Sequence, residues 1–324
     1  MFNPLHRMLL ATALLPATAL AAPPPGPDIR TEDATRFYAM YDAAGGKPSV
    51  TQLQQYLDDG TPGLAEFVTL RRVTAQRIAE RIAADPAMYD KARQCLDELP
   101  AVRKRLVQVF ANLQRLYPDA RFPPVTIAVG RGRPVGLTSP SGVLIGLEAL
   151  CAADFMNPNA QDRFVHVIAH EYIHIQQTAR VDFEPNDPDN NVLRMSLVEG
   201  IAELVTELVS GEVGNGRHAQ WTRGKEARIE SAFALDLDST NLTPWLYNYQ
   251  PGSDEPYDLG YWVGYRIAKA YYLKADDKRA ALRRLLLQDD PKAILEESGW
   301  APGMWMPAKA PAPVDVPLFL HGSS

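Results

Sequence analysis

The sequence lacks a long hydrophobic run beyond its first residues, a run of basic residues, an internal repeat and a G-x-S-x-G motif. A membrane-spanning helix needs about 20 consecutive apolar residues, so the bulk of the chain offers no membrane segment. The net charge is −6 at pH 7, and an acidic chain without a basic run lacks the electrostatic footprint of a protein that binds nucleic acid or anionic lipid. The absence of a nucleophile elbow argues against serine hydrolase chemistry.

The first 21 residues have the features of a secretory signal peptide. Arg7 provides a positive n-region, Met8 to Leu20 form a short apolar h-region, and Ala19-Leu20-Ala21 fits a small-residue cleavage site. A membrane anchor is the alternative, but the apolar run is short for a span and contains Pro16. We therefore expect a signal peptide over residues 1–21, then a linker over residues 22–30.

The mature chain is expected in the periplasm or secreted. No Cys follows the apolar run, so a lipoprotein anchor is not supported, and we expect no stable membrane insertion after the leader is removed. Loss of Arg7 brings the net charge from −6 to −7. Cys95 and Cys151 are the only cysteines. In an oxidising compartment they could form a disulfide, and two buried free thiols are the open alternative.

Hydrophobic periodicity predicts an α+β fold that is predominantly helical. Residues 31–120 are expected to form a helical N-terminal part, because their apolar residues recur at helical spacing. A small mixed or antiparallel sheet is expected from three short segments, 125–129, 135–138 and 142–146. Further helices are expected over residues 157–180, 192–210, 259–273 and 278–287. The elements form one domain over residues 31–300, with a catalytic part over 121–300, and a loosely packed, Pro-containing tail over 301–324.

The sequence His170-Glu171-Tyr172-Ile173-His174 is an H-E-x-x-H motif on a predicted helix. Residues four apart project on the same side of a helix, so two imidazoles can hold one ion. Glu171 can then reach a water at the metal without being a ligand. With six His in the chain, about 0.014 such matches are expected by chance. The alternative, two surface histidines beside an unrelated Glu, is therefore less well supported than a zinc site.

A catalytic zinc site needs three protein ligands and an open position for water. Glu199 is the best third ligand, because it lies on the polar stripe of the next predicted helix. Glu203, one turn further on, is expected to accept a hydrogen bond from the other nitrogen of a ligand histidine. Gly200 inside that helix favours close approach to another element. The alternatives are a solvated Glu stripe or another ligand, namely Asp182, Glu184, Asp187 or Cys151.

These motifs resemble those of known zinc peptidases. H-E-x-x-H followed by Glu199-Gly-x-Ala-Glu203 is similar to the gluzincins, whose third ligand is Glu. More narrowly, the chain resembles a bacterial family of proteases classed as zinc-dependent from their motif and related to gliding-motility lipoproteins. The further stretches that carry this resemblance are 56–64, 117–124 and 258–265. The resemblance implies a zincin-like domain and a zinc site, and implies less about the substrate. A Cys ligand would resemble peptide deformylases, which are intracellular, and the leader argues against that interpretation.

The resemblance also implies roles for residues around the metal. Glu171 is expected to be the general base, and a later Tyr or His would donate a hydrogen bond to the oxyanion. Tyr261 and Tyr265 are the candidates, with His218 third, although each Tyr could simply pack in the core. By analogy with zincins, the strand over residues 142–146 is expected to be the edge strand that aligns the substrate. His166 lies too far along the helix to complete the site, about 12 Å from His174.

The sequence thus predicts an exported zinc-dependent hydrolase that cleaves a peptide or protein substrate. Two alternatives remain open at this point. The first is a binding or structural protein of the cell envelope that retains a zinc site without proteolysis. The second is zinc-dependent hydrolysis of another bond, such as a cell-wall amide. The sequence does not determine the oligomeric state.

Overall fold

The computed structural model describes residues 26–133, 135–153, 157–177, 189–211, 216–250 and 256–312. The predicted signal peptide, the second half of the tail (residues 313–324), and the rival ligands Asp182, Glu184 and Asp187 lie outside these residues. The described part is mostly helical with one small sheet, so the predicted α+β, predominantly helical class is confirmed. No described helix is long and apolar enough to cross a membrane.

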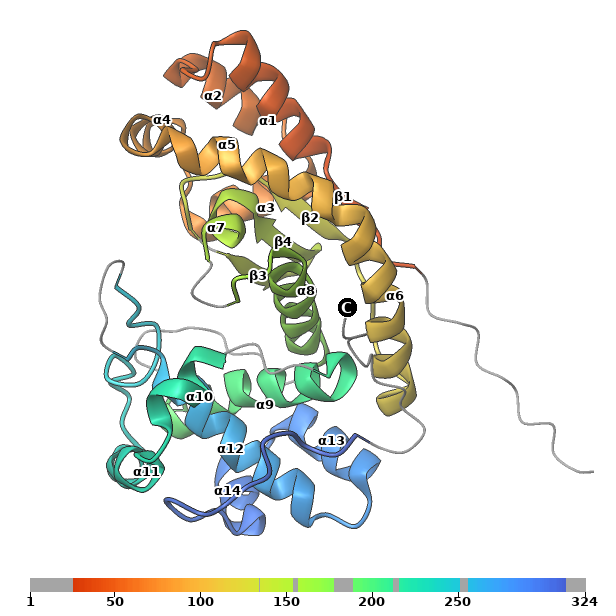
Figure 1. Ribbon diagram of the computed structural model, residues 1–324, viewed down its shortest axis with the longest axis vertical. Helices are drawn as coiled ribbons and strands as arrows, with labels where there is room; N and C mark the ends of the chain where they lie inside the picture. The colour runs from red at the N-terminus through yellow and green to blue at the C-terminus, as the bar shows by residue number, and fades with distance from the viewer. Residues whose placement is uncertain are drawn as a thin grey trace, which may run out of the picture.

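A four-stranded mixed sheet lies near the middle of the chain's fold (Figure 1). Its order is β1 (Ile29–Arg30), β2 (Val125–Ala128), β4 (Gly142–Gly146) and β3 (Gly136–Ser139). Strands β1 and β4 run parallel to β2, whereas β3 runs antiparallel to β4. The prediction that residues 142–146 form the edge strand is wrong. That strand pairs on both sides, because the tight turn after Ser139 folds β3 onto its outer side, and β3 is the edge.

The N-terminal part packs on the sheet as a series of helices, in agreement with the periodicity of residues 31–120. They are α1 (Glu32–Ala43), α2 (Val50–Asp58), α3 (Pro62–Arg71), α4 (Ala75–Ala84), α5 (Pro86–Cys95), the short 3-10 helix η1 (Leu96–Glu98) and α6 (Leu99–Leu116). Side chains of Ser49, Thr61, Thr74 and Asp85 cap α2 to α5 in turn. Each cap satisfies a backbone N–H that the first helical turn leaves without a partner.

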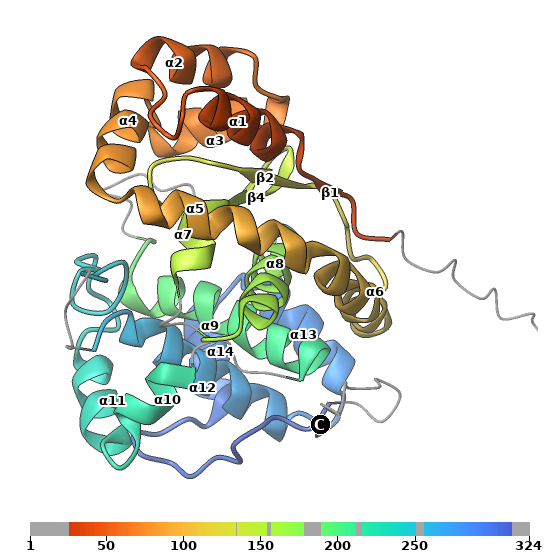
Figure 2. The ribbon, with the colours of Figure 1, turned by 45° about the horizontal axis from the view of Figure 1, so that its top comes forward.

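The remaining helices follow β4 in the sequence, and the first two of them pack against α5 and α6. They are α7 (Leu147–Ala152), α8 (Ala160–Gln176), α9 (Val192–Ser210), α10 (Gly216–Thr222), α11 (Glu226–Leu235), α12 (Leu259–Lys274), α13 (Lys278–Leu287) and α14 (Pro291–Ser298). Helix α8 extends from the sheet toward α9, and α12 packs along α9 on the side away from the sheet (Figures 1 and 2). The polar stretch after residue 211 contains α10 and α11, which periodicity did not predict.

Helices α9 and α12 approach each other closely through two glycines. A Cβ atom on Gly200 would lie 2.1 Å from the carbonyl carbon of Gly264, and one on Gly264 would lie 1.7 Å from the carbonyl oxygen of Ser196. No larger residue fits at either position without separating the helices. The expectation that Gly200 permits close approach to another element is confirmed, and that element is α12.

Cys95 and Cys151 form a disulfide that joins the end of α5 to α7. This removes Cys151 from the candidate metal ligands. The expectation of a loosely packed tail stays a prediction: the described segment 301–312 is mostly exposed, but it is attached to the helices by hydrogen bonds. Lys269 donates to the carbonyl oxygen of Ala308 at 3.0 Å, and the backbone nitrogen of Ala310 donates to Glu207 at 2.8 Å. Prolines prevent this segment from forming a helix, but they do not prevent it from hydrogen bonding to α9 and α12.

Candidate metal centre

Helix α8 begins with a side-chain cap and is anchored by a buried arginine. The side chain of Asn159 accepts a hydrogen bond from the backbone nitrogen of Asp162, as an N-cap does. Arg163 donates to the carbonyl oxygens of Leu150 and Cys151 at 3.1 and 3.0 Å. Because these contacts connect the first turn of α8 to α7, they fix the start of the helix that carries both histidines.

Three side-chain atoms converge where α8 packs against α9. Nε2 of His170 and Nε2 of His174 lie 3.0 Å apart, and each lies 3.2 Å from Oε2 of Glu199. In a tetrahedral zinc site with bonds of about 2.0–2.1 Å, the ligand atoms stand about 3.3 Å from one another. Two imidazoles and one carboxylate at this spacing therefore fit a zinc ion. The residues expected as ligands are brought together by the fold.

The other ring nitrogen of each histidine faces an acceptor, which leaves both Nε2 atoms free for a metal. Nδ1 of His174 donates to Oε1 of Gln177 at 2.7 Å, and Nε2 of Gln177 donates to the carbonyl oxygen of Val198 at 2.8 Å. Nδ1 of His170 lies 3.1 Å from Oε1 of Glu203. A partner on Nδ1 sets the tautomer of a ligand histidine and holds its ring. The sequence predicted Glu203 in this role, and the structure places it in ion-pair contact with His170. Gln177, directly after α8, was not predicted.

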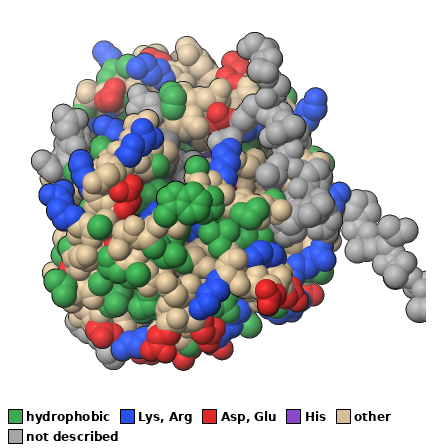
Figure 3. All heavy atoms as spheres, turned by 60° about the horizontal axis from the view of Figure 1, so that its bottom comes forward, with side chains coloured by type: hydrophobic (Ala, Val, Ile, Leu, Met, Phe, Trp, Pro, Cys, Tyr) green, Lys and Arg blue, Asp and Glu red, His purple; other side chains and the backbone are tan. Residues whose placement is uncertain are grey.

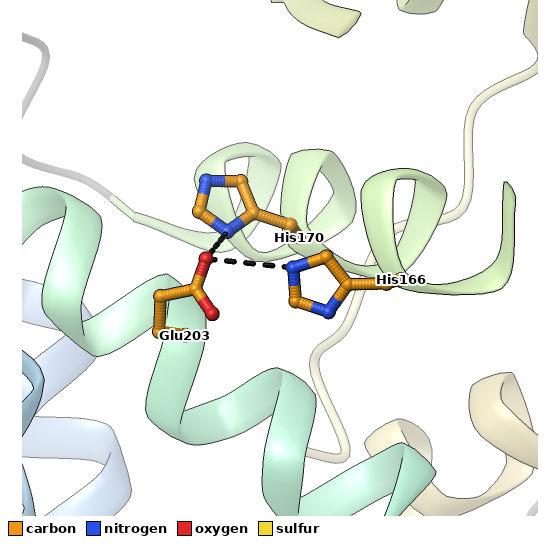
Figure 4. Close-up of side chains that lie close together, drawn as sticks. All are labelled: His166, His170 and Glu203. Carbon is orange, nitrogen blue, oxygen red and sulfur yellow. Dashed lines mark ion pairs between the residues drawn. The ribbon is translucent and has the colours of Figure 1, made fainter. Parts of the chain in front are cut away.

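Glu203 lies between two imidazoles (Figure 4). Its Oε1 is 3.4 Å from Nε2 of His166 as well as 3.1 Å from Nδ1 of His170. All three side chains are buried. His166, His170 and Glu203 thus form a second group of side chains close enough to hold a metal ion, and the expectation that His166 does not complete the site stays a prediction.

Strong charge coupling links these side chains. Burial alone lowers the pKa of His170, but the contacts with Glu199 and Glu203 outweigh it and raise the pKa well above its ordinary value. Burial raises the pKa of Glu199, but the neighbouring His174 and His170 lower it by more. The net pKa is therefore below its ordinary value, and the carboxyl is ionised. The cluster thus has an acidic side chain that attracts positive charge to one place. A divalent cation bound between these side chains would displace the protons from the imidazole rings.

Glu171, the expected general base, is held beside the two imidazoles by the edge strand. The hydroxyl of Thr138 lies 2.9 Å from Oε2 of Glu171 and 2.8 Å from its carbonyl oxygen. A Cβ atom on Gly136 would lie 3.1 Å from Oε1 of Glu171. Strand β3 therefore passes directly over Glu171, and the small residue at 136 leaves room for its carboxylate.

A cavity of about 250 Å³ opens at the centre. It is lined by residues of α8, α9, α10 and α12, by the start of β3 and by the segments around Tyr249 and Tyr257, and of the three expected ligands it includes His170. Tyr261 of α12 lines it and stacks on His170, with ring centroids 6.3 Å apart. Burial and the nearby Glu199 raise the pKa of Tyr261 well above its ordinary value, so its hydroxyl keeps its proton. Tyr261 therefore lies beside His170 with a protonated hydroxyl, and its role as the oxyanion donor stays a prediction.

Tyr247 is a contact of the centre that sequence reasoning missed. Its hydroxyl donates to Oε1 of Glu199 at 3.2 Å, although the residue as a whole is 48% exposed. Its backbone is left-handed, with φ at 59°, which is uncommon for a tyrosine. Such conformations are often kept at functional sites. A tyrosine in a loop without periodicity offers no sequence signal for this contact.

Tyr265 and His218 do not have the geometry that was expected of an oxyanion donor. The hydroxyl of Tyr265 donates to Glu207 at 2.7 Å and accepts from Lys269 at 2.7 Å, away from the two ligand imidazoles. One helical turn separates it from Tyr261, which is enough to point it to another part of α9. Nε2 of His218 donates to the carbonyl oxygen of Tyr257 at 2.8 Å, and burial lowers the pKa of His218. Its remaining nitrogen is then an acceptor and cannot stabilise an oxyanion.

The comparisons with known proteins agree with this centre. No curated protein and no solved structure matches the chain. Residues 150–294 match the model of a family described as "Predicted Zn-dependent protease (DUF2268)". This segment contains His170, Glu171, His174 and Glu199. Over this part of its length, the chain is therefore similar to a family of predicted zinc-dependent proteases.

Proposed function

We propose that this protein is an exported zinc-dependent peptidase of the gluzincin type, with His170, His174 and Glu199 as the metal ligands. The observation that carries the proposal is the convergence of two Nε2 atoms and one carboxylate oxygen within 3.2 Å of one another, beside Glu171. The match to the protease family supports the same class of activity. A structural helix would instead present these polar groups to solvent.

The chemistry follows from the positions of the side chains. When bound, zinc supplies a Lewis acid that lowers the pKa of water and polarises a carbonyl group. Glu171 accepts a proton from the attacking water and returns it to the leaving amine. Tyr261, with its hydroxyl protonated, donates a hydrogen bond to the oxyanion. Tyr247 is a second candidate donor, because its hydroxyl already lies at Glu199.

The free edge of β3 provides a place for an extended substrate. Its partner β4 occupies one side, and Thr138 connects the strand to Glu171. An extended peptide can add to such an edge through main-chain hydrogen bonds. The peptide bond beside Glu171 would then be the one that is cleaved. This alignment rests on analogy with zincins.

Export is supported by two independent features. The first 21 residues have the pattern of a signal peptide. The disulfide between Cys95 and Cys151 is typical of an oxidising compartment. N-terminal sequencing of the protein from the periplasm or medium tests this part, and we expect a mature chain that begins at residue 22. An intact Met1 in a membrane fraction would contradict it.

Metal analysis and two variants test the centre. We expect about one zinc per chain in the purified protein. Glu171→Gln should retain the zinc and lower the rate of peptide hydrolysis by about 10²–10⁴-fold, because it removes the proton acceptor. Glu199→Ala should lose the zinc. The matched control is Glu296→Gln, an exposed carboxylate on α14. If Glu199→Ala bound as much zinc as the wild type, Glu199 would not be the third ligand. If Glu171→Gln kept full activity, Glu171 would not be the general base.

The envelope binding protein with a non-proteolytic zinc site remains the second candidate. Its discriminating test is hydrolysis of unfolded casein and of a peptide library, with inhibition by a chelator and recovery on adding zinc. Zinc at full occupancy without hydrolysis of any peptide would favour the binding protein. A parallel screen of cell-wall amides tests hydrolysis of other bonds.

A further inference from the structure

Four arginines gather at one side of the metal cavity. Arg71 ends α3, Arg77 lies on α4, and Arg131 and Arg133 lie between β2 and β3. Nη2 of Arg131 donates to the carbonyl oxygen of Arg71 at 3.2 Å, and Nη1 of Arg77 donates to that of Arg72 at 3.1 Å. These contacts hold the three segments together. We call Arg71, Arg77, Arg131 and Arg133 the arginine cluster.

No acidic side chain pairs with the arginine cluster in the described part of the chain. Eight other arginines of that part do have such partners, and single arginines such as Arg228 do not. The paired arginines are Arg30, Arg36, Arg81, Arg93, Arg105, Arg266, Arg283 and Arg284. On the face shown in Figure 3, Lys and Arg side chains are dispersed and acidic side chains lie near several of them. Burial, and then the charges of Arg77, Arg133 and Arg71, lower the pKa of Arg131. An acidic protein thus concentrates unpaired positive charge here.

The loop that carries two of these arginines is rigidly held. The backbone nitrogens of Gly130 and Gly132 donate to Oε1 of the fully buried Glu148, at 3.0 and 2.8 Å. Arg131 lies between these two glycines, and Arg133 follows them directly. Because Glu148 fixes the backbone of this loop, the guanidinium groups need little reorganisation to bind a ligand.

The arginine cluster lies at the rim of the proposed active site. Arg133 comes shortly before Val135 and Gly136, which line the metal cavity. Arg71 acts electrostatically on Tyr247, whose hydroxyl is 3.2 Å from Glu199. The arginine cluster therefore lies close to the side of the cavity that Val135 and Gly136 line, and close to Tyr247. A charged group at a cleft opening attracts ligands of opposite sign.

We infer that the arginine cluster binds carboxylate groups of the substrate, so that the enzyme prefers acidic peptides. This inference rests on the proposed peptidase function. Guanidinium groups bind carboxylates through paired hydrogen bonds. A peptide along β3 advances about 3.3 Å per residue. Since Gly136 lies at Glu171 and Arg133 precedes β3 in the sequence, we expect the bound carboxylate a few residues from the cleaved bond. Asp or Glu side chains, or the free C-terminal carboxylate, could supply it.

Matched quenched peptides test this preference on the zinc-loaded, full-length mature protein. One set carries Asp or Glu three residues from the centre on either side, a second carries Asn or Gln, and a third carries Lys. Each peptide is made with a free and an amidated C-terminus. We expect the lowest KM for the acidic set at low salt, with the difference reduced at high salt. Loss of the difference on amidation alone would assign the carboxylate to the C-terminus.

The double variant Arg77→Gln and Arg133→Gln changes only exposed side chains, so it should fold. We expect it to raise KM for the acidic set about tenfold, with kcat and the neutral set unchanged. Arg133→Glu should shift the preference toward the Lys set. The matched control is Arg228→Gln, an exposed arginine on α11. An unchanged KM for acidic peptides, or an equal rise in KM for all three sets of peptides, would overturn the inference.

Binding to Glu171→Gln separates this inference from the proposed function. Fluorescence anisotropy with the acidic and neutral peptides measures affinity without cleavage. If no peptide is cleaved but acidic peptides bind more tightly through the arginine cluster, the carboxylate-binding site is supported and the proposed peptidase function is refuted. Cleavage of peptides without a preference for acidic ones would support the peptidase function and overturn the carboxylate-binding site. Tighter binding of polyphosphate or nucleic acid than of acidic peptides would also overturn it.

Discussion

The two ends of the polar stripe on α9 have the same residue type and different partners. At one end, Glu199 and Glu203 face the imidazoles of α8 at 3.1–3.2 Å. At the other, Glu207 lies 3.7 Å from Nζ of Lys269 and accepts from Tyr265 and from the backbone of Ala310. All three carboxylates are buried. Their partners come from different elements.

This difference teaches that a buried Glu on a helix takes its role from the charge opposite it. Opposite imidazoles, which can exchange a proton for a metal, the carboxylate is a candidate ligand or the candidate partner of a ligand. Opposite a lysine, which cannot bind a metal while protonated, it becomes half of a structural ion pair. Glu207 and Lys269 thereby attach the segment around residue 308 to α9 and α12. The three predictions below test this division.

The largest effect is expected from Glu207→Ala. This variant leaves Lys269 buried without its partner, and breaking a buried pair from one side costs about 3–5 kcal/mol of unfolding free energy. Zinc content should not change. Chemical denaturation and metal analysis measure the two quantities. Replacing both partners, as Glu207→Leu with Lys269→Met, should restore much of the stability. Loss of zinc from Glu207→Ala would show that Glu207 also acts on the metal centre, which contradicts the difference drawn between the two ends of α9.

Glu203→Gln should act on the metal and less on stability. It keeps the size of the side chain but removes the charge that faces Nδ1 of His170, so we expect zinc affinity to fall by about 10–100-fold. Competition with a fluorescent chelator measures this affinity. The wild type and Glu296→Gln serve as references. If Glu203→Gln held zinc as tightly as the wild type, the carboxylate would have only a packing role.

The smallest effect is expected from Tyr247→Phe. This variant removes one hydrogen bond to Glu199, in a residue that is partly exposed, so activity should fall about tenfold or less. Zinc stoichiometry should remain that of the wild type. Comparison with Tyr261→Phe at equal zinc content would show which hydroxyl acts on the reaction. A larger loss in Tyr247→Phe than in Tyr261→Phe would assign the oxyanion donor to Tyr247.

Much of the centre could be predicted from sequence because its spacing is local. His170, Glu171 and His174 lie within one helical turn, so a helix brings them together whatever surrounds it. The polar stripe of the next helix identified Glu199 and Glu203, and Gly200 indicated a close contact. Tyr247 could not be found in this way, because its position depends on a loop with a left-handed residue. The edge strand was misassigned because the order of strands in a sheet depends on pairing between segments.

The sequence by itself determined the long helices and three of the four strands, and it identified the residues proposed at the metal, since these follow from periodicity along single segments. Only the tertiary structure decided which carboxylate faces an imidazole and which faces a lysine, which tyrosine reaches the cavity, and where arginines gather. The physical reason is that helical spacing acts over a few residues, whereas burial and charge pairing depend on segments far apart in the chain. An acidic composition therefore gave no sign of a positive rim.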